Sequence, residues 1–170
     1  MSTLLSIGNE KSPDLIVLFT CAEVIDDLFL AALEWGDERS KSTHYVRRSR
    51  FERVPCVPAA YLSDPARLMT ITFYYESQPL EKAAELATNL YDEVTQSLII
   101  VENDEESYLG DHAVANTLAL LSTFSHNDRR SIVCLPFDEN LAMISTLFTD
   151  HVFVYNEDGT LSELDKLTER

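Results

Sequence analysis

The clearest hydrophobic pattern lies between residues 67 and 102. From Gln78 to Gln96, apolar residues recur every three or four positions and charged residues take the other side, as in an amphipathic helix. Two β-rich runs flank this segment, Leu68–Tyr75 before it and Ser97–Val101 after it. A strand, a helix and a strand within about forty residues predict a βαβ unit with a right-handed crossover.

The same alternation extends over most of the chain. Asp14–Cys21 is a continuous apolar run, which is typical of a strand covered by helices on both faces. Ala22–Trp35 predicts a helix whose apolar surface is wider than one stripe, and Gly36 stands where a C-terminal cap belongs. The later pattern predicts helices at Asp111–Phe124 and at Glu139–Leu147 capped by Asp138, strands at Ser131–Leu135 and His151–Tyr155, a turn at Asn156–Gly159, and a short amphipathic tail containing Leu161, Leu164 and Leu167.

Residues 36–66 interrupt this alternation. They contain six of the chain's 13 basic residues and several prolines: Arg39, Lys41, Arg47, Arg48, Arg50 and Arg53, followed by Pro55, Pro58 and Pro65. Connections of this length are uncommon in compact domains unless they are functional or disordered. We therefore expect a single α/β domain over residues 1–170, with a mostly parallel or mixed sheet, helices on its faces and a long basic excursion after the first helix. An edge hairpin around His44–Val54 is one way to fold part of the excursion.

Arginines and aromatic residues are interleaved within this excursion. We take six of these residues as predicted partner contacts, because this composition is enriched where proteins meet: Tyr45, Arg47, Arg48, Arg50, Phe51 and Arg53. Three alternatives remain open. In the first, the basic excursion is a solvated loop; in the second, it neutralises the chain's own acidic surface; in the third, it carries a phosphorylation switch at Ser49.

The formal net charge of −16 changes which partners are plausible. It argues against direct binding of nucleic acid or of anionic membranes, both of which need a basic face. It fits simple solubility, complementarity to a basic protein, or mimicry of nucleic acid. No apolar run approaches the roughly 20 residues of a membrane-spanning helix, and Met1–Lys11 lacks the pattern of a signal peptide, so we expect a cytosolic or nuclear protein.

The cysteines Cys21, Cys56 and Cys134 have no paired spacing, and we interpret them as buried reduced thiols.

Motifs that carry chemistry are missing from the sequence. The four glycines form no phosphate-binding pattern, the four histidines have no metal-binding spacing, and there is no nucleophile elbow. The acidic, glycine-poor turns that follow the apolar runs would repel a nucleotide. The acidic turn at Glu102–Glu106 is a weak candidate for a divalent cation, because adjacent residues rarely converge on one point. We therefore predict no catalytic, cofactor-binding or metal-binding residues.

The second half of the chain resembles the eukaryotic proteasome assembly chaperones that act as heterodimers on the α-ring. The resemblance lies in the layout of Leu68–Val101, Tyr108–Phe124, Ile132–Pro136 and Asp138–Leu147. It implies a non-enzymatic α/β domain that pairs with a sister chaperone. Many members carry a C-terminal hydrophobic–Tyr–any tripeptide, whereas this sequence ends Leu167-Thr168-Glu169-Arg170 and has Val154-Tyr155-Asn156 inside the chain.

These observations predict a protein without catalysis. We expect an assembly chaperone or an obligate subunit of a larger complex, with a protein partner in a hetero-oligomer. The alternative is an acidic decoy that occupies a basic, nucleic-acid-binding surface of another protein. Salt separates the two, because an interface between opposite charges weakens steeply with ionic strength and an apolar one does not.

Overall fold

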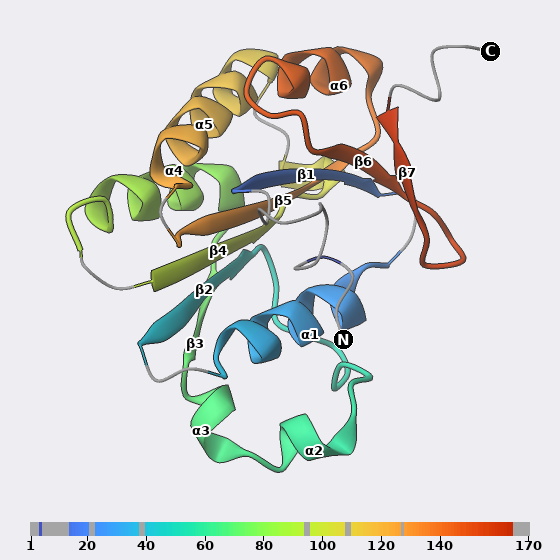
Figure 1. Cartoon of the computed structure of the whole chain (residues 1–170). Helices are drawn as coiled ribbons and strands as arrows, with labels where there is room; N and C mark the ends of the chain where they lie inside the picture. The colour runs from blue at the N-terminus through green and yellow to red at the C-terminus, as the bar shows by residue number, and fades with distance from the viewer. Residues whose placement is uncertain are drawn as a thin grey trace.

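Seven strands form one sheet in the computed structural model, which describes residues 4, 14–20, 23–37, 40–93, 96–107, 110–126 and 128–164 (Figure 1). The strands are β1 (Leu15–Thr20), β2 (Lys41–Arg47), β3 (Ile71–Tyr75), β4 (Gln96–Glu102), β5 (Arg130–Pro136), β6 (Val152–Tyr155) and β7 (Leu161–Glu163). Their order across the sheet is β3-β2-β4-β5-β1-β6-β7. Every neighbouring pair is parallel except β6 with β7. The predicted α/β fold with a mostly parallel sheet is confirmed.

Helices cover both faces of this sheet (Figure 1). α4 (Pro79–Asn89), α5 (Asp111–Phe124) and α6 (Glu139–Thr146) lie on one face, and α1 (Ile25–Trp35) lies on the other, with the short α2 (Ala59–Leu62) and α3 (Pro65–Leu68) on its side of the sheet. A one-turn 3₁₀ helix, η1 (Glu105–Ser107), follows β4. At α6, the Asp138 carboxylate accepts a hydrogen bond from the Leu141 N–H at 3.0 Å, so the predicted cap is confirmed.

The sheet divides the hydrophobic core into two layers. Along β1, Leu15, Val17 and Phe19 pack under α4, α5 and α6, while Ile16 and Leu18 pack against α1. Side chains of a strand alternate between faces, so a strand covered on both sides must be apolar at every position. The continuous apolar run at the start of the sequence follows from this requirement.

The structure departs from our expectation between residues 36 and 66. Lys41–Arg47 is an interior strand, β2, hydrogen-bonded in parallel to β3 and β4, and the expected edge hairpin around His44–Val54 is wrong. β2 was not predicted as a strand because several of its residues are polar, and their side-chain contacts are with residues of other strands. His44 Nδ1 lies 2.9 Å from the Tyr74 hydroxyl, and the Ser42 and Ser97 hydroxyls are 3.4 Å apart.

Several element ends also differ from the expected ones. α4 ends at Asn89 instead of Gln96, and Tyr91 is 45% exposed where we expected an inward-facing residue. Leu68 belongs to α3, so β3 starts at Ile71. Leu161 lies in β7, an antiparallel edge strand, instead of in an amphipathic tail; Leu167 lies outside the described residues.

Gly36 does end α1, but for a different reason than expected. Its φ of −75° is one that any residue can adopt, so no left-handed conformation requires glycine here. A Cβ at this position would overlap the Thr70 Oγ1 and lie 3.2 Å from the Thr70 Cβ. Glycine is needed because the end of α1 passes directly against the residue that precedes β3.

Candidate functional site

Six parallel strands, β1 to β6, end at one edge of the sheet, the carboxyl edge, where α/β proteins usually bind their ligands. β2 ends at Arg47 and its neighbour β4 ends at Glu102. From there the chain leads away in opposite directions across the sheet, from β2 to β3 and from β4 to β5. Two neighbouring strands whose connections diverge form a topological switch point, which is the favoured position for a binding crevice.

A buried ion pair occupies this switch point. The Arg47 Nε lies 2.9 Å from the Glu102 Oε2, and the Tyr45 hydroxyl donates a 2.9 Å hydrogen bond to the same oxygen. The side chains of Arg47 and Glu102 are 13% and 18% exposed, and Tyr45 is fully buried. The Arg47 guanidinium stacks over the Phe51 ring, 4.1 Å from its centroid.

The ion pair does not fully offset the effect of burial on the pKa of its carboxyl group. Burial raises the pKa of the Glu102 carboxyl, and the opposing effects of Arg47 and the Tyr45 hydrogen bond do not cancel it. Burial, and then the Glu102 charge, raise the pKa of Tyr45 well above its usual value. The Nε and Nη1 of Arg47 are both buried without a hydrogen-bond partner among the described residues, so the contact of Nε with Glu102 is a close ion pair and not an aligned hydrogen bond.

Further ion pairs tie the basic segment to the acidic turns around it. Arg48 pairs with Asp104 at 2.8 Å and with Glu106 at 2.9 Å. Arg53 pairs with Asp26 at 2.9 Å and reaches Glu23 at 3.5 Å. The alternative in which the arginines neutralise the chain's own acidic surface therefore describes Arg47, Arg48 and Arg53.

The six predicted partner-contact residues do not form one surface. Tyr45 lies in the core and donates to Glu102, so its place among the contacts is a correction. Phe51 packs edge-on against Phe29 at 5.9 Å and Phe73 at 5.7 Å between ring centroids, and Arg47 is mostly buried above it. Arg48, Arg50 and Arg53 remain at the surface.

Two adjoining cavities open along the carboxyl edge. The first, of about 350 Å³, is lined by Thr20, Glu23, Val24, Ile25, Glu102, Asn103, Asp104, Glu105, Cys134 and Pro136. The second, of about 440 Å³, is lined by Glu23, Ile25, Arg47, Ser49, Arg50, Phe51, Glu52 and Arg53; we call it the arginine cavity. The first is acidic and the second is rich in arginine, so they favour ligands of opposite charge.

The first cavity does not support nucleophilic chemistry by its cysteine. The Cys134 thiol is buried, and burial raises its pKa well above the usual value, so the reactive thiolate is disfavoured. Asn103 is 5% exposed, and its Oδ1 has no hydrogen-bond partner among the described residues. The buried thiol agrees with our interpretation of Cys134, whereas Cys56 is exposed and Cys21 lies outside the described residues.

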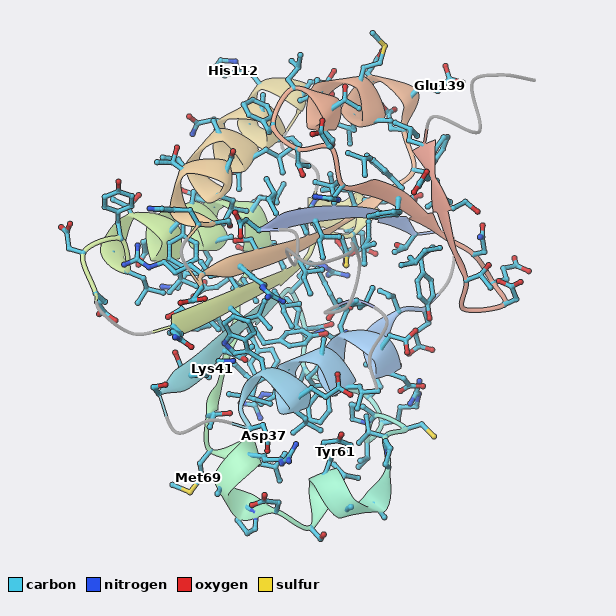
Figure 2. The ribbon with its side chains drawn as sticks, viewed as in Figure 1. Asp37, Lys41, Tyr61, Met69, His112 and Glu139 are labelled. Atoms are coloured by element: carbon cyan, nitrogen blue, oxygen red, sulfur yellow. The ribbon has the colours of Figure 1, made fainter. Side chains whose placement is uncertain are left out.

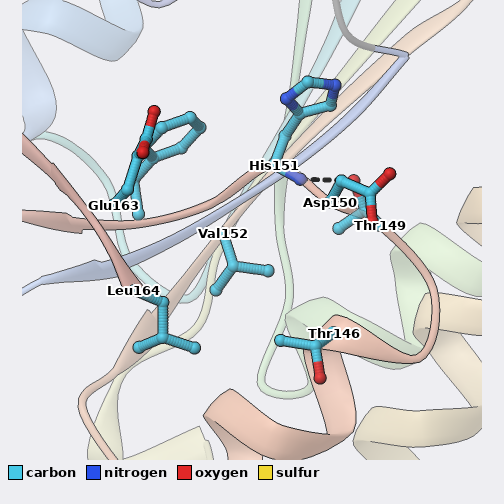
Figure 3. Close-up of a pocket in the computed structure, with 8 residues that line it drawn as sticks. Thr146, Thr149, Asp150, His151, Val152, Glu163 and Leu164 are labelled. Carbon is cyan, nitrogen blue, oxygen red and sulfur yellow. Dashed lines mark hydrogen bonds between the residues drawn. The ribbon is translucent and has the colours of Figure 1, made fainter. Parts of the chain in front are cut away.

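A third cavity, of about 410 Å³, lies near the amino end of β6 (Figure 3). Its lining includes Thr146, Asp150, His151 and Glu163, and the His151 backbone N–H donates to the Thr149 Oγ1 at 3.1 Å. The His151 ring stacks against Phe153 with centroids 6.5 Å apart. This end of a parallel strand is opposite to the edge where α/β proteins place their ligands.

The internal Val154-Tyr155 pair lies in β6, where both side chains are buried. The Tyr155 hydroxyl donates a short hydrogen bond to Asp27 of α1. In this position the pair helps to join β6 to α1, and it is not presented for docking.

The parts of the chain that the structure describes hold no group of three or more His, Cys, Asp or Glu side chains placed to bind a metal ion. None of the helices described is both long and apolar enough to cross a bilayer. Comparisons with models of protein families, with curated proteins and with solved structures found no match to this chain.

Proposed function

We propose that the chain is a non-catalytic protein-binding subunit, either an assembly chaperone or an obligate part of a larger complex. The observation that supports this most is the edge strand β3. Its sequence is Ile-Thr-Phe-Tyr-Tyr. Proteins usually prevent unwanted pairing of an edge strand with a charged residue or a proline, and this strand contains neither. An unprotected apolar edge strand is a ready template for a strand of another protein.

The geometry of β3 defines which backbone groups are available. On the side of β2, the Thr43 N–H donates to the Thr70 carbonyl and the Glu76 N–H donates to the Arg47 carbonyl. In a parallel ladder these groups alternate, so the backbone groups of Ile71, Phe73 and Tyr75 face the open edge. No strand among the described residues pairs with that side.

Exposed apolar side chains lie at both ends of β3. Met69, just before the strand, is 85% exposed and projects outward beside α3 (Figure 2), and Tyr75, at its end, is 40% exposed. These side chains would extend an interface based on backbone hydrogen bonds into one with an apolar component.

Charge favours a particular occupant for this edge. Residues 40–75 contain six basic and two acidic residues within a chain of −16, and four of the six basic residues pair with carboxylates outside this range: Arg47, Arg48, Arg53 and Arg67. Arg50 lies over the Tyr75 ring at the end of β3 with no carboxylate paired to it among the described residues, so pairing two copies through β3 would bring two such positive charges into one interface. We therefore assign the edge to an acidic strand of a different protein, which makes the complex a hetero-oligomer.

The carboxyl edge supports the non-enzymatic part of the proposal. Ion pairs of Arg47, Arg48 and Arg53 occupy the place where α/β enzymes assemble catalytic groups. The resemblance to proteasome assembly chaperones makes proteasome α-subunits and a sister chaperone the first partners to test.

Tyr75→Pro is expected to abolish partner binding while leaving the fold intact. The Tyr75 N–H faces the open edge, so proline removes no bond to β2 but blocks one to an added strand. Tyr75→Ala, the matched control, removes the same side chain and keeps the N–H, and it should retain the partner. The measurement is affinity purification from the native cell with mass spectrometry, alongside thermal melts of both variants. Loss of the partner from both variants, or from neither, would contradict pairing through β3.

The acidic remainder of the chain keeps one competing function open. Outside residues 40–75 the formal net charge is −20, as an acidic decoy for a basic surface would need. A decoy's partner should be stripped by about 0.5 M salt and be indifferent to Tyr75→Pro. A partner held through β3 should survive that salt, because backbone bonds and apolar contacts are screened little.

A further inference from the structure

The arginine cavity lies at the carboxyl end of β2, beside the switch point with β4. Of the three cavities it is the one in which positively charged side chains outnumber carboxylates, with Arg47, Arg50 and Arg53 against Glu23 and Glu52. Arg53 is engaged by Asp26 and Glu23. What the cavity can bind therefore depends on the donors of the other two arginines.

Neither of those arginines has its hydrogen-bonding capacity filled. The Arg47 Nε lies 2.9 Å from the Glu102 Oε2 as an ion pair, but both Nε and Nη1 are buried without a hydrogen-bond partner in the described part of the chain. Arg50 is exposed and lies near the Tyr75 ring, 5.8 Å from its centroid, with no carboxylate paired to it among the described residues. A buried guanidinium N–H without an acceptor is costly, so a ligand that supplies an acceptor would stabilise the site.

We propose that the arginine cavity binds a phosphate monoester, held by Arg47, Arg50 and the hydroxyl of Ser49. Arg50 supplies a positive charge that no carboxylate among the described residues offsets, Arg47 adds hydrogen-bond donors although Glu102 offsets its charge, and arginine is the preferred residue for planar, two-pronged contacts to phosphate oxygens. The three donors come from three different side chains and suit the several oxygens of a tetrahedral anion better than the two of a planar carboxylate. This site lies beside the β3 edge, where Arg50 stands over the Tyr75 ring, and it goes beyond the proposed function.

The other residues of the cavity limit the ligand. Glu23 and Glu52 line the same space and would repel the additional charges of a polyphosphate. No glycine-rich loop brings backbone N–H groups to the cavity, so recognition depends on side chains. The expected ligand therefore carries one phosphate, and ATP should bind more weakly than a monoester.

The test is a titration of the whole protein with inorganic phosphate, followed by amide NMR shifts at constant ionic strength. We expect saturable shifts centred on residues 47–53, with half-saturation between about 1 and 10 mM, as expected for two or three charge-assisted hydrogen bonds at a solvent-open site. Arg50→Gln should weaken binding at least about tenfold. Arg48→Gln is the matched control: it removes the same charge two residues away, from a side chain paired with Asp104 and Glu106 outside the cavity lining, and binding should change less than about twofold.

Three results would overturn the proposal. Shifts that rise without saturation would show no site, equal weakening by Arg48→Gln and Arg50→Gln would show diffuse attraction, and equally tight binding of acetate would exclude phosphate as the preferred class. A phosphoserine peptide and a sugar phosphate then distinguish the two sources of a monoester. The tighter one identifies the source, and failure of both to bind would also refute the site.

Discussion

Replacing Arg47 by alanine is expected to lower the free energy of unfolding by about 3 kcal/mol, at the low end for one member of a buried ion pair. The variant leaves the Glu102 carboxylate, 18% exposed, without its counter-charge, and it removes the packing of the guanidinium on Phe51. The low end applies because both side chains keep some contact with water. Urea denaturation at neutral pH measures the change.

Arg48→Ala is the control for this experiment. Arg48 is next in the sequence and pairs with two carboxylates, Asp104 and Glu106, but these side chains are 47% and 74% exposed. Exposed ion pairs contribute about 0–1 kcal/mol, so Arg48→Ala should stay within that range. Equal losses in the two variants would mean that the Arg47–Glu102 pair is not buried in solution.

The cost of Arg47→Ala should also depend on pH. Burial raises the pKa of Glu102 in the folded protein, so the folded state holds this proton more tightly than the unfolded chain does. The stabilisation from that proton is complete below the unfolded pKa and is lost as the pH rises through the folded pKa. Without Arg47 the folded pKa rises further, so the destabilisation should shrink as the pH falls from about 7 towards 4. A cost that is constant over this range would contradict the assignment.

The elements that the sequence predicted best are those whose faces are set by local periodicity. The continuous apolar run of β1 and the wide apolar surface of α1 correspond to a strand and a helix that are covered on more than one side. β2 was not predicted as a strand because its sequence contains no continuous apolar run; it reads Lys-Ser-Thr-His-Tyr-Val-Arg. The polar side chains of His44 and Ser42 contact Tyr74 and Ser97, which come from strands that lie far along the chain, whereas the buried Thr43 hydroxyl has no hydrogen-bond partner among the described residues.

The candidate site was harder to predict for the same physical reason. Arg47 and Glu102 meet because the parallel register of β2 and β4 pairs Val46 with Val101 and so places the two following residues side by side. Nothing in the local sequence of either residue encodes that register. The available signals were a carboxylate directly after a buried apolar run, at Glu102, and a segment rich in arginine far earlier in the chain, at residues 47–53. Those signals suggested electrostatic contact but could not identify the pair.

Leu90→Ala should cost about 2–5 kcal/mol, whereas Glu85→Ala on the same helical segment should stay within about 0.5 kcal/mol. Leu90 is the C-cap of α4, 8% exposed, and it packs in the core layer under α4 and α5, as the apolar periodicity predicted. Removing its side chain loses the free energy of transfer from water and leaves a cavity that the surrounding core fills only in part.

Glu85 provides the matched comparison because it lies on the exposed side of α4, paired with Lys82 at 3.0 Å. Exposed pairs of this spacing contribute a few tenths of a kcal/mol, and alanine restores part of that through its higher helix propensity. Denaturant melts of the two variants should therefore differ by at least about 1.5 kcal/mol. Equal losses would mean that α4 presents a different face to the sheet, and the division of the core into two layers would then be wrong on this side.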